Sequence, residues 1–405
     1  MGVPRRDKVK QADVIGLKYF KKLMPLLAPL HDVGCESDRA GNRKLFFDQY
    51  CALILLYMFN PVVSSLRAIQ QASELKKVQK KLGCTRASLG SLSESAGVFD
   101  ADRLREIIAT LGEELQPIGR DARLADVKQV LTLVDGTLLK ALPQMAAAMW
   151  LDDAHRAFRL HTHFEFDRSV PVRMDLTDGA NTGASGEKQV LREALLPDHC
   201  YVMDRGYAEF ALFNAILAAG SSYVCQVRDN STFEVHEERW LSPEAQEAGV
   251  VTDLVVRMGL HSKPPARPDH RIRLVTVKVE PHVKRSHRKG NTGAGPSDGL
   301  LRIATNLMDV PAEIIALIYR HRWAIETFFR FFKHILGCRH LLSHCANGIE
   351  IQMYCAIIAC MLISLWSGRK PTLRTYEMIC HYFAGLADEE ELIAHIDKLQ
   401  RHGAR

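Results

Sequence analysis

The spacing of apolar residues changes near residue 127, and this change limits the possible folds more than any other feature of the sequence. Before this point apolar residues recur at helical spacing, as in FFDQYCALILLYMF and in DADRLREIIATLGEEL, where Asp100 is a candidate helix cap. After it, segments such as VPVRMDLTD alternate with period two, which is typical of half-buried strands. A chain of 405 residues is long enough for two or three domains. We therefore expect an all-α N-terminal domain over residues 1–125 and a separate α/β part.

The α/β part alternates strands and helices in an order that predicts a mixed sheet. Three strands (VKQVLTLVD, AFRLHTHFEF, VPVRMDLTD) are followed by helix GEKQVLREALL, strand CYVMD, helix YAEFALFNAILAAG and strand SYVCQVRD. A polar, strand-like stretch comes next, and an amphipathic helix follows it. The run MYCAIIACMLISLW is too short to span a bilayer and predicts a buried helix, so we expect no membrane association.

Charge and cysteine content are compatible with a cytoplasmic protein that meets a polyanion. The net charge is +6, the ten cysteines follow no disulfide spacing, and the N-terminus MGVPRRDKVK lacks an apolar signal segment. Seven basic residues lie between 271 and 289, with Glu280 as the single acid. Such a segment is either a solvated loop or a surface that contacts phosphate. Lysines between 76 and 81 fit either a DNA-binding bundle or a plain helical domain, and the sequence favours neither.

The stretch YRHRWAIETFFRFFK, residues 319–333, predicts a helix with one polar face. At about 100° per residue, Tyr319, Arg322, Glu326 and Lys333 fall at roughly 0°, −60°, −20° and −40°. Apolar side chains, among them Phe328 and Phe332, cover the opposite side. The polar face is either an ordinary solvated surface or part of a site in which anionic ligands, among them the Glu326 carboxylate, are arranged around a cation.

Two aspartates follow apolar strands and complete a candidate metal site. Asp135 ends LTLVD and Asp204 ends CYVMD, where each could be a simple turn residue. If the two strands are adjacent and parallel, both carboxylates project at one edge of the sheet. With Glu326 they form three hard oxygen ligands, which suit Mg²⁺ or Mn²⁺. Two such ions about 4 Å apart can promote phosphoryl transfer.

Other candidate sites are weaker. GCRHLLSHC contains the potential zinc ligands Cys338, His340, His344 and Cys345, but their spacing fits no common finger. His161, His163 and Glu165 share one strand face, for which an exposed polar surface is the expected explanation. The glycine-rich loop at 290–299 lacks Gly-Lys-Ser/Thr, so we expect no nucleotide cofactor.

The sequence resembles the DDE transposases of bacterial insertion sequences, in the IS-four branch with a Tyr-x-x-Arg-x-x-x-Glu-x-x-x-x-x-x-Lys signature. Tyr319, Arg322, Glu326 and Lys333 match that signature in full, and Asp135 in VDGT and Asp204 in MDRGY match the two aspartate motifs. The resemblance covers residues 127–366, and the N-terminal part is similar only loosely.

The resemblance implies a ribonuclease-H-like α/β core with a β-rich insertion, preceded by the all-α domain and followed by C-terminal helices. The implied divisions are 1–125 for DNA binding, 126–229 for the first part of the core, 230–305 for the insertion, 306–345 for the glutamate helix, and 346–405 for a helical region that is a candidate for dimerisation. It further implies cut-and-paste transposition in the bacterial cytoplasm, at the nucleoid, with a homodimer pairing double-stranded inverted-repeat ends and joining them to target DNA.

The resemblance also assigns residue roles. Asp135, Asp204 and Glu326 are the implied catalytic and metal-binding residues. The candidate DNA-phosphate contacts come instead from the polar helix and from the basic segment, and they are Tyr319, Arg322, Lys333, Arg330, Lys284, Arg285, Arg288 and Lys289. In this branch cleavage often passes through a DNA hairpin with a flipped base held by an aromatic residue. Trp240 is the only tryptophan of the insertion and the candidate for that role, with buried packing as its alternative.

Two other functions remain open at this stage. One is a transposase-derived DNA-binding protein that no longer cuts, although such a protein has no physical need of three metal-binding carboxylates. The other is a structure-directed nuclease on the same fold, which would need neither the insertion nor an end-binding domain. Terminal inverted repeats flanking the coding sequence would distinguish the transposase from both.

Overall fold

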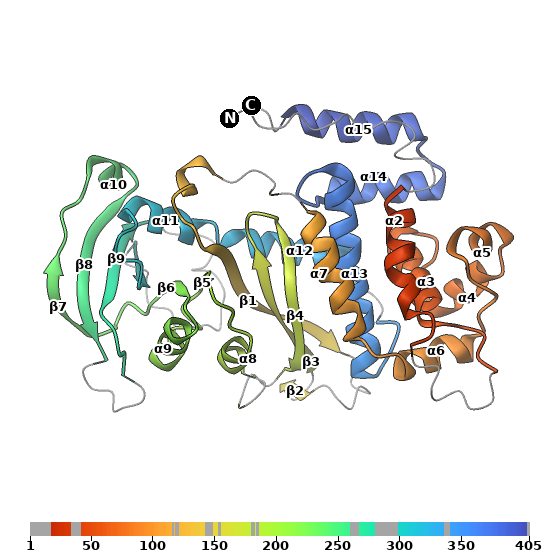
Figure 1. Cartoon of the computed structure of the whole chain (residues 1–405), viewed down its shortest axis with the longest axis horizontal. Helices are drawn as coiled ribbons and strands as arrows, with labels where there is room; N and C mark the ends of the chain where they lie inside the picture. The colour runs from red at the N-terminus through yellow and green to blue at the C-terminus, as the bar shows by residue number, and fades with distance from the viewer. Residues whose placement is uncertain are drawn as a thin grey trace.

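The computed structural model of the chain contains one large mixed sheet with helices on both sides (Figure 1). It describes residues 18–33, 42–115, 117, 121–141, 149–152, 155–179, 183, 186–259, 267–279, 299–335 and 341–402.

The sheet has ten strands in the order β2-β3-β1-β5-β6-β10-β9-β8-β7, with β4 paired to β3. Their bounds are β1 Val130–Ala141, β2 Met149–Asp152, β3 His155–Glu165, β4 Val170–Asp178, β5 His199–Met203, β6 Ser222–Gln226, β7 Phe233–Glu238, β8 Val250–Met258, β9 Ile272–Lys278 and β10 Leu300–Thr305. β1, β5 and β6 are parallel neighbours, whereas β1–β3, β3–β4 and all pairs from β6 through β10 to β7 are antiparallel. The strands predicted from alternating segments are therefore confirmed. The strands of the 230–305 stretch continue the same sheet from β6, so one hydrogen-bonded layer joins them to the core.

Helices α8 Glu187–Glu193 and α9 Phe210–Ala218 cover one face of the parallel strands, as their apolar faces predict. Helices α11 Ala312–Arg320 and α12 Trp323–Ile335 lie against the other face. Tyr201 and Met203 of β5 pack with the first pair of helices, whereas Val202 belongs to the core on the other side. Because side chains alternate along a strand, each residue of β5 and β1 can be assigned either to the face covered by α8 and α9 or to the face covered by α11 and α12.

The predicted N-terminal helices are present throughout the described part of that region. They are α2 Lys18–Leu27, α3 Phe47–Phe59, α4 Leu66–Ser73, α5 Lys76–Leu82, α6 Leu89–Val98 and α7 Arg103–Glu114. Asp100 does not cap α7 directly, because the chain makes one more turn before Arg103, and Asp100 Oδ1 instead accepts a hydrogen bond from the Asp102 backbone N–H at 3.0 Å. The remaining helices are α10 Pro243–Glu247, α14 Leu373–Ala384 and α15 Glu389–His402, with short 3₁₀ turns at Ala28–Leu30 and Ala122–Leu124.

Helix α13, Ala346–Ser367, joins the N-terminal helices to the sheet. It packs on α2, α3, α6 and α7 on one side and on α12 and β4 on the other, and one continuous apolar core runs through all of them (Figure 1). By length and composition α13 could cross a membrane, but 89% of its most apolar window is buried inside the protein. The prediction of a buried core helix is confirmed, because neighbouring helices already cover its apolar surface.

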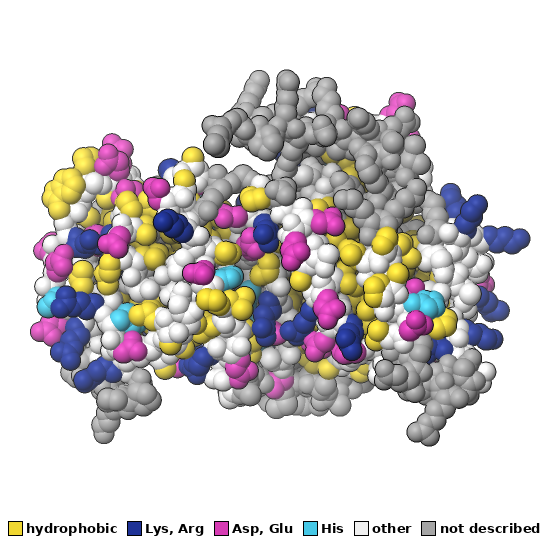
Figure 2. All heavy atoms as spheres, in the orientation of Figure 1, with side chains coloured by type: hydrophobic (Ala, Val, Ile, Leu, Met, Phe, Trp, Pro, Cys, Tyr) yellow, Lys and Arg dark blue, Asp and Glu magenta, His cyan; other side chains and the backbone are white. Residues whose placement is uncertain are grey.

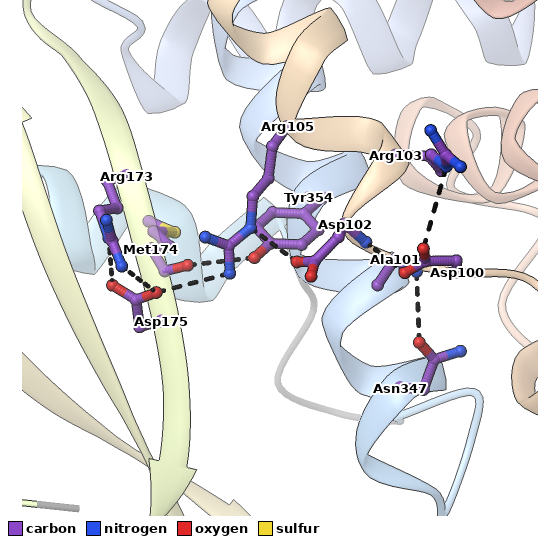
Figure 3. A network of polar contacts seen from close by, with 10 residues as sticks. All are labelled: Asp100, Ala101, Asp102, Arg103, Arg105, Arg173, Met174, Asp175, Asn347 and Tyr354. Atoms are coloured by element: carbon purple, nitrogen blue, oxygen red, sulfur yellow. Dashed lines mark hydrogen bonds and ion pairs between the residues drawn. The ribbon is translucent and has the colours of Figure 1, made fainter. Parts of the chain in front are cut away.

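A polar network fixes the N-terminal helices to the edge of the sheet (Figure 3). Arg105 of α7 pairs with Asp102 at 2.8 Å and donates to Asp175 of β4 at 3.5 Å. Tyr354 of α13 donates its hydroxyl hydrogen to the Met174 carbonyl at 3.2 Å, and Arg105 lies over the Tyr354 ring. Contacts among three elements distant in sequence hold the helices in a defined position relative to the core.

Candidate active site

The two aspartates lie side by side on neighbouring parallel strands, as predicted. Leu133 of β1 is in register with Val202 of β5, so Asp135 and Asp204, each two residues further on, stand level with one another. Asp204 directly follows the end of β5, but Asp135 does not end β1, which continues to Ala141 by pairing with β3. The possibility that Asp135-Gly136 is a turn is therefore wrong, because β3 supplies backbone partners on that side of β1.

Asp135 lies in an environment that opposes its ionisation. Its pKa is raised to about 7, chiefly by burial and then by the nearby Asp204 carboxylate, while Arg322 and the Gly136 N–H act in the opposite direction. Its Oδ1 accepts a hydrogen bond from the Gly136 N–H at 2.8 Å. Asp204 Oδ1 accepts one from the Gly206 N–H at 2.7 Å. Each aspartate is thus oriented by its own backbone, and the two carboxylates repel one another.

The stretch 319–333 is not one helix, contrary to the prediction. Helix α11 ends at Arg320, and the chain turns through bonds from Arg322 N–H to the Tyr319 carbonyl and from Ala324 N–H to the His321 carbonyl before α12 begins. The turn lets the His321 ring pack on Phe166 at 4.3 Å while Arg322 points at the carboxylates. Sequence periodicity could not reveal this break, since the stretch contains neither glycine nor proline.

Arg322 connects two of the three predicted metal ligands. Its guanidinium donates to Glu326 Oε1 at 2.8 Å and lies 3.7 Å from Asp135 Oδ2. The arginine side chain is only 11% exposed, and the two acids are 30% and 21% exposed. A cationic group therefore occupies the space between Asp135 and Glu326, and the three carboxylates share one side of the sheet with it.

The other two members of the signature lie on the same two helices, Tyr319 on α11 and Lys333 on α12. Tyr319 is buried and donates its hydroxyl hydrogen to Gln226 Oε1 of β6 at 2.9 Å. Lys333 lies half-buried seven residues beyond Glu326 on α12, and Arg330 is exposed on the same helix. The predicted apolar face is confirmed by the buried side chains of Ile325, Phe328, Phe331 and Phe332.

The donor set suits a divalent cation, but the side chains are not gathered around one. Carboxylate oxygens are the preferred ligands of Mg²⁺ and Mn²⁺, and Arg322 already places positive charge between two of them. Within the described part of the chain, no three His, Cys, Asp or Glu side chains are arranged to hold a metal ion. Binding a cation through Asp135, Asp204 and Glu326 would therefore require Arg322 to release its two partners.

Four nearby residues escaped the sequence analysis. Gln226 orients Tyr319, Tyr207 lies near Asp135 and Asp204, Glu187 lies near Asp135, and Arg159 donates to Glu187. Tyr207 belongs to the MDRGY motif, so its position beside Asp204 was a usable signal. Glu187 and Arg159 carry no such signal, because they come from a helix start and a strand that only the fold brings together.

The remaining predicted residues are distributed as follows. Trp240 is 81% exposed, so the alternative of buried packing is wrong for it. His161 and His163 are buried rather than exposed, because β3 is an interior strand between β1 and β4 and their face is covered. Lys284, Arg285, Arg288 and Lys289 lie outside the described residues, as do Cys338 and His340 of the candidate zinc motif.

An exposed basic patch lies far from this site on the N-terminal helices. Figure 2 shows Lys and Arg side chains gathered at the edge of the molecule formed by α4 and α5. Its exposed members are Arg67, Lys76, Lys77, Lys80 and Arg86. Arg86 pairs with Glu74 at 3.0 Å, and the other side chains present their charge to solvent as polyanion-binding surfaces do.

Comparison with known proteins extends these observations. A family model described as "Transposase DDE domain" matches residues 127–362, which agrees closely with the predicted range of resemblance. A putative transposase y4zB of Sinorhizobium fredii is 26% identical over 239 residues, covering 59% of this chain and 61% of that protein. A probable transposase for insertion sequence element IS5377 of Geobacillus stearothermophilus is 27% identical over 207 residues, covering 51% and 48%.

The chain thus matches only about half to three fifths of these relatives' own length. Among solved structures, a piggyBac transposase synaptic complex with hairpin DNA gives a TM-score of 0.39 at 11% identity, covering 84% of this chain and 70% of that one. A score this low carries no argument about function or detailed fold.

Proposed function

The chain belongs to the transposase DDE domain family, and from this premise we propose that it moves an insertion sequence by cut-and-paste DNA transposition. We further assign it to the IS-four branch. That assignment is supported by Tyr319, Arg322, Glu326 and Lys333 at the signature spacing, and by the contact that joins Arg322 to Glu326. The observation that carries the proposal is that Asp135, from β1, and Glu326, from α12, meet at one guanidinium beside Asp204.

We propose a ribonuclease-H-like core for residues 126–229 together with α12. The proposal is supported by the strand order β4-β3-β1-β5-β6, in which three antiparallel strands come first in the chain and β5 and β6 then add parallel to β1. Two aspartates on adjacent parallel strands and a glutamate on a later helix would then share one side of the sheet. Strands β7 to β10 would be the insertion before the glutamate helix.

In the proposed mechanism Asp135, Asp204 and Glu326 hold Mg²⁺ or Mn²⁺, with two ions expected. When bound, such ions activate a water or a 3′-hydroxyl and stabilise the leaving oxygen of an in-line phosphoryl transfer. The raised pKa of Asp135 means that burial and its acidic neighbours disfavour the empty ionised site, so positive charge is favoured there. At present Arg322 supplies that charge.

Release of Arg322 would give it a second role. Its guanidinium would leave the carboxylates and bind the DNA phosphate that enters the site, where a planar fork of donors suits phosphate oxygens. Lys333, further along α12, would contact the same strand as a point charge. Tyr319 stays bound to Gln226 and would place α11 and Arg322 relative to β6. Arg330 is exposed on α12 and available to the DNA backbone.

We propose that the basic patch on α4 and α5 binds the terminal inverted repeats, and that the basic segment 271–289 adds phosphate contacts. Arg273 is the exception in that segment, because it is buried in an ion pair with Asp253 at 2.7 Å. The first part is supported by the exposed charges of the patch and by the polar network that holds this region against the core. Pairing of two ends requires two copies, so we expect a homodimer acting on DNA in the bacterial cytoplasm. Trp240 is exposed enough to stack on a flipped base if cleavage proceeds through a hairpin.

The test is cleavage of a labelled duplex carrying one element end, with Mg²⁺, beside gel-shift binding of the same DNA. Glu326→Gln keeps size and helix propensity but removes the ligand charge, so cutting should be lost while DNA binding remains. Glu377→Gln, an exposed acid on α14, is the matched control and should cut normally. Normal cutting by Glu326→Gln would refute the proposed role of α12.

A further inference from the structure

A buried ion pair lies behind the candidate metal ligands, on the opposite face of β1. Arg159 of β3 donates to Glu187, in the first turn of α8, and the two side chains are only 15% and 18% exposed. Successive residues of a strand point to opposite faces, so Asp135 faces α12 and Gly136 faces α8. The pair is therefore next to the site, with a single strand between them.

Gly136 allows this close approach. A Cβ built on this glycine would lie 2.4 Å from Glu187 Oε1 and 3.1 Å from its Cδ. Glu187 therefore fills the space that any other residue at position 136 would occupy, and its charge acts on Asp135, whose ionisation it opposes. The glycine of the VDGT motif is thus explained by the approach of this carboxylate rather than by a turn.

A third polar group points to the same place. Tyr207, three residues after Asp204, is 1% exposed, and its hydroxyl has no hydrogen-bond partner among the described residues. Its electrostatic neighbours are Glu187, Asp135 and Asp204. A buried donor without a partner costs free energy unless some state of the protein satisfies it. Three carboxylates therefore act electrostatically on a buried hydroxyl that has no hydrogen-bond partner among the described residues.

We propose that Glu187 is a positioning residue of the metal site, which neutralises Arg159 behind Asp135 and so keeps the site attractive to a divalent cation. The inference rests on the proposed function, because it presumes that Asp135 and Asp204 bind the metal. Glu187 is not itself a ligand in this arrangement, since β1 separates it from Glu326 and Arg322. It acts through the charge of Arg159 and through contact with Gly136.

Removing the charge of either member of the Arg159–Glu187 pair should change Mn²⁺ affinity in opposite directions. Glu187→Gln leaves the Arg159 charge uncompensated beside Asp135, so Mn²⁺ affinity should fall about five-fold. Arg159→Gln removes the positive charge that lies against Glu187, so affinity should rise by about the same factor. The double variant should return to within about two-fold of the wild type. A pair that served only to hold the fold would lower affinity, or leave it unchanged, in both single variants.

The experiment is calorimetric titration of the full-length, DNA-free protein with Mn²⁺, with circular dichroism to verify folding. Glu187→Asp preserves the charge and should bind Mn²⁺ nearly as well as the wild type, which decides the matter if Arg159→Gln does not fold. Asp100→Asn and Arg103→Gln break an exposed pair at the start of α7 and are the controls. If wild type binds no Mn²⁺, the proposed function itself fails. If wild type binds but Glu187→Gln matches it, or both single variants shift in the same direction, the role of Glu187 is refuted.

Discussion

Replacing Asp135 with asparagine should make the metal-free protein more stable at pH 8. Burial is the main cause of the raised pKa of this group, followed by repulsion from Asp204, and these outweigh the attraction of Arg322. An asparagine keeps the shape and the acceptor for the Gly136 N–H but carries no charge. Removal of an unfavourable charge should therefore stabilise a protein that simultaneously loses its proposed activity.

The magnitude follows from the difference between the folded and unfolded pKa values. The folded pKa of Asp135 is about 7, whereas the ordinary value for an aspartate is 3.8, so the folded state binds more protons between these limits and stability falls as pH rises through them. About three pKa units correspond to about 4 kcal/mol of unfolding free energy, fully expressed above pH 7. Near pH 4 the difference between Asp135→Asn and wild type should shrink below about 1 kcal/mol.

The assay is urea unfolding in EDTA at a series of pH values, comparing wild type with Asp135→Asn. Asp121→Asn is a control of opposite sign, because hydrogen bonds from Arg123 lower the pKa of Asp121 to about 2. Its loss should destabilise the protein at pH 8, slightly, since the pair is largely exposed. The electrostatic reasoning would be refuted if Asp135→Asn were less stable than wild type at pH 8. It would also be refuted if the difference in unfolding free energy between the two proteins were the same at every pH.

Three further predictions follow from individual contacts. Tyr319→Phe removes the hydrogen bond to Gln226 and should lower the unfolding free energy in urea by about 1 kcal/mol. Its loss of cleavage activity should be smaller than that of Arg322→Ala, and an unchanged unfolding free energy would contradict the prediction. Burial lowers the pKa of His163 to about 4, so the protein should lose about 3 kcal/mol of unfolding free energy as pH falls from 6.5 through 4. His163→Gln should flatten the plot of unfolding free energy against pH in this range, and an unchanged slope would contradict the prediction. Lys76→Gln with Lys80→Gln should weaken end binding and reduce the slope of log affinity against log salt by about two, whereas an unaltered slope would exclude α5 from the DNA interface.

Most of the local structure could be predicted from the sequence, because its signals are local. Period-two alternation identified β3 and β4, and apolar runs identified β1, α3, α9 and α13. The pairing of Asp135 with Asp204 was also predictable, since aspartates after consecutive parallel strands meet at one place in an α/β sheet. Glu326 was predicted from the polar face of the 319–333 stretch, and the resemblance to a known family then assigned all three carboxylates as catalytic.

Features that depend on tertiary contacts could not be predicted. The break between α11 and α12 depends on His321 packing against Phe166 and on Arg322 reaching Asp135. Burial of His161 and His163 depends on which strands flank β3, and alternation alone does not specify strand order. The approach of Glu187 to Gly136 joins residues from a helix and a strand some fifty positions apart, without a motif to mark it.

The central claim is that Asp135, Asp204 and Glu326 form one metal site from which Arg322 must withdraw. The most direct test is a crystal structure of the protein bound to an element-end duplex and soaked in Mn²⁺, with ions located by anomalous scattering. We predict manganese bound by all three carboxylates, with the Arg322 guanidinium moved from Asp135 and Glu326 to a DNA phosphate. Manganese bound elsewhere, or Arg322 still joining the two acids in a complex competent to cut, would contradict the claim.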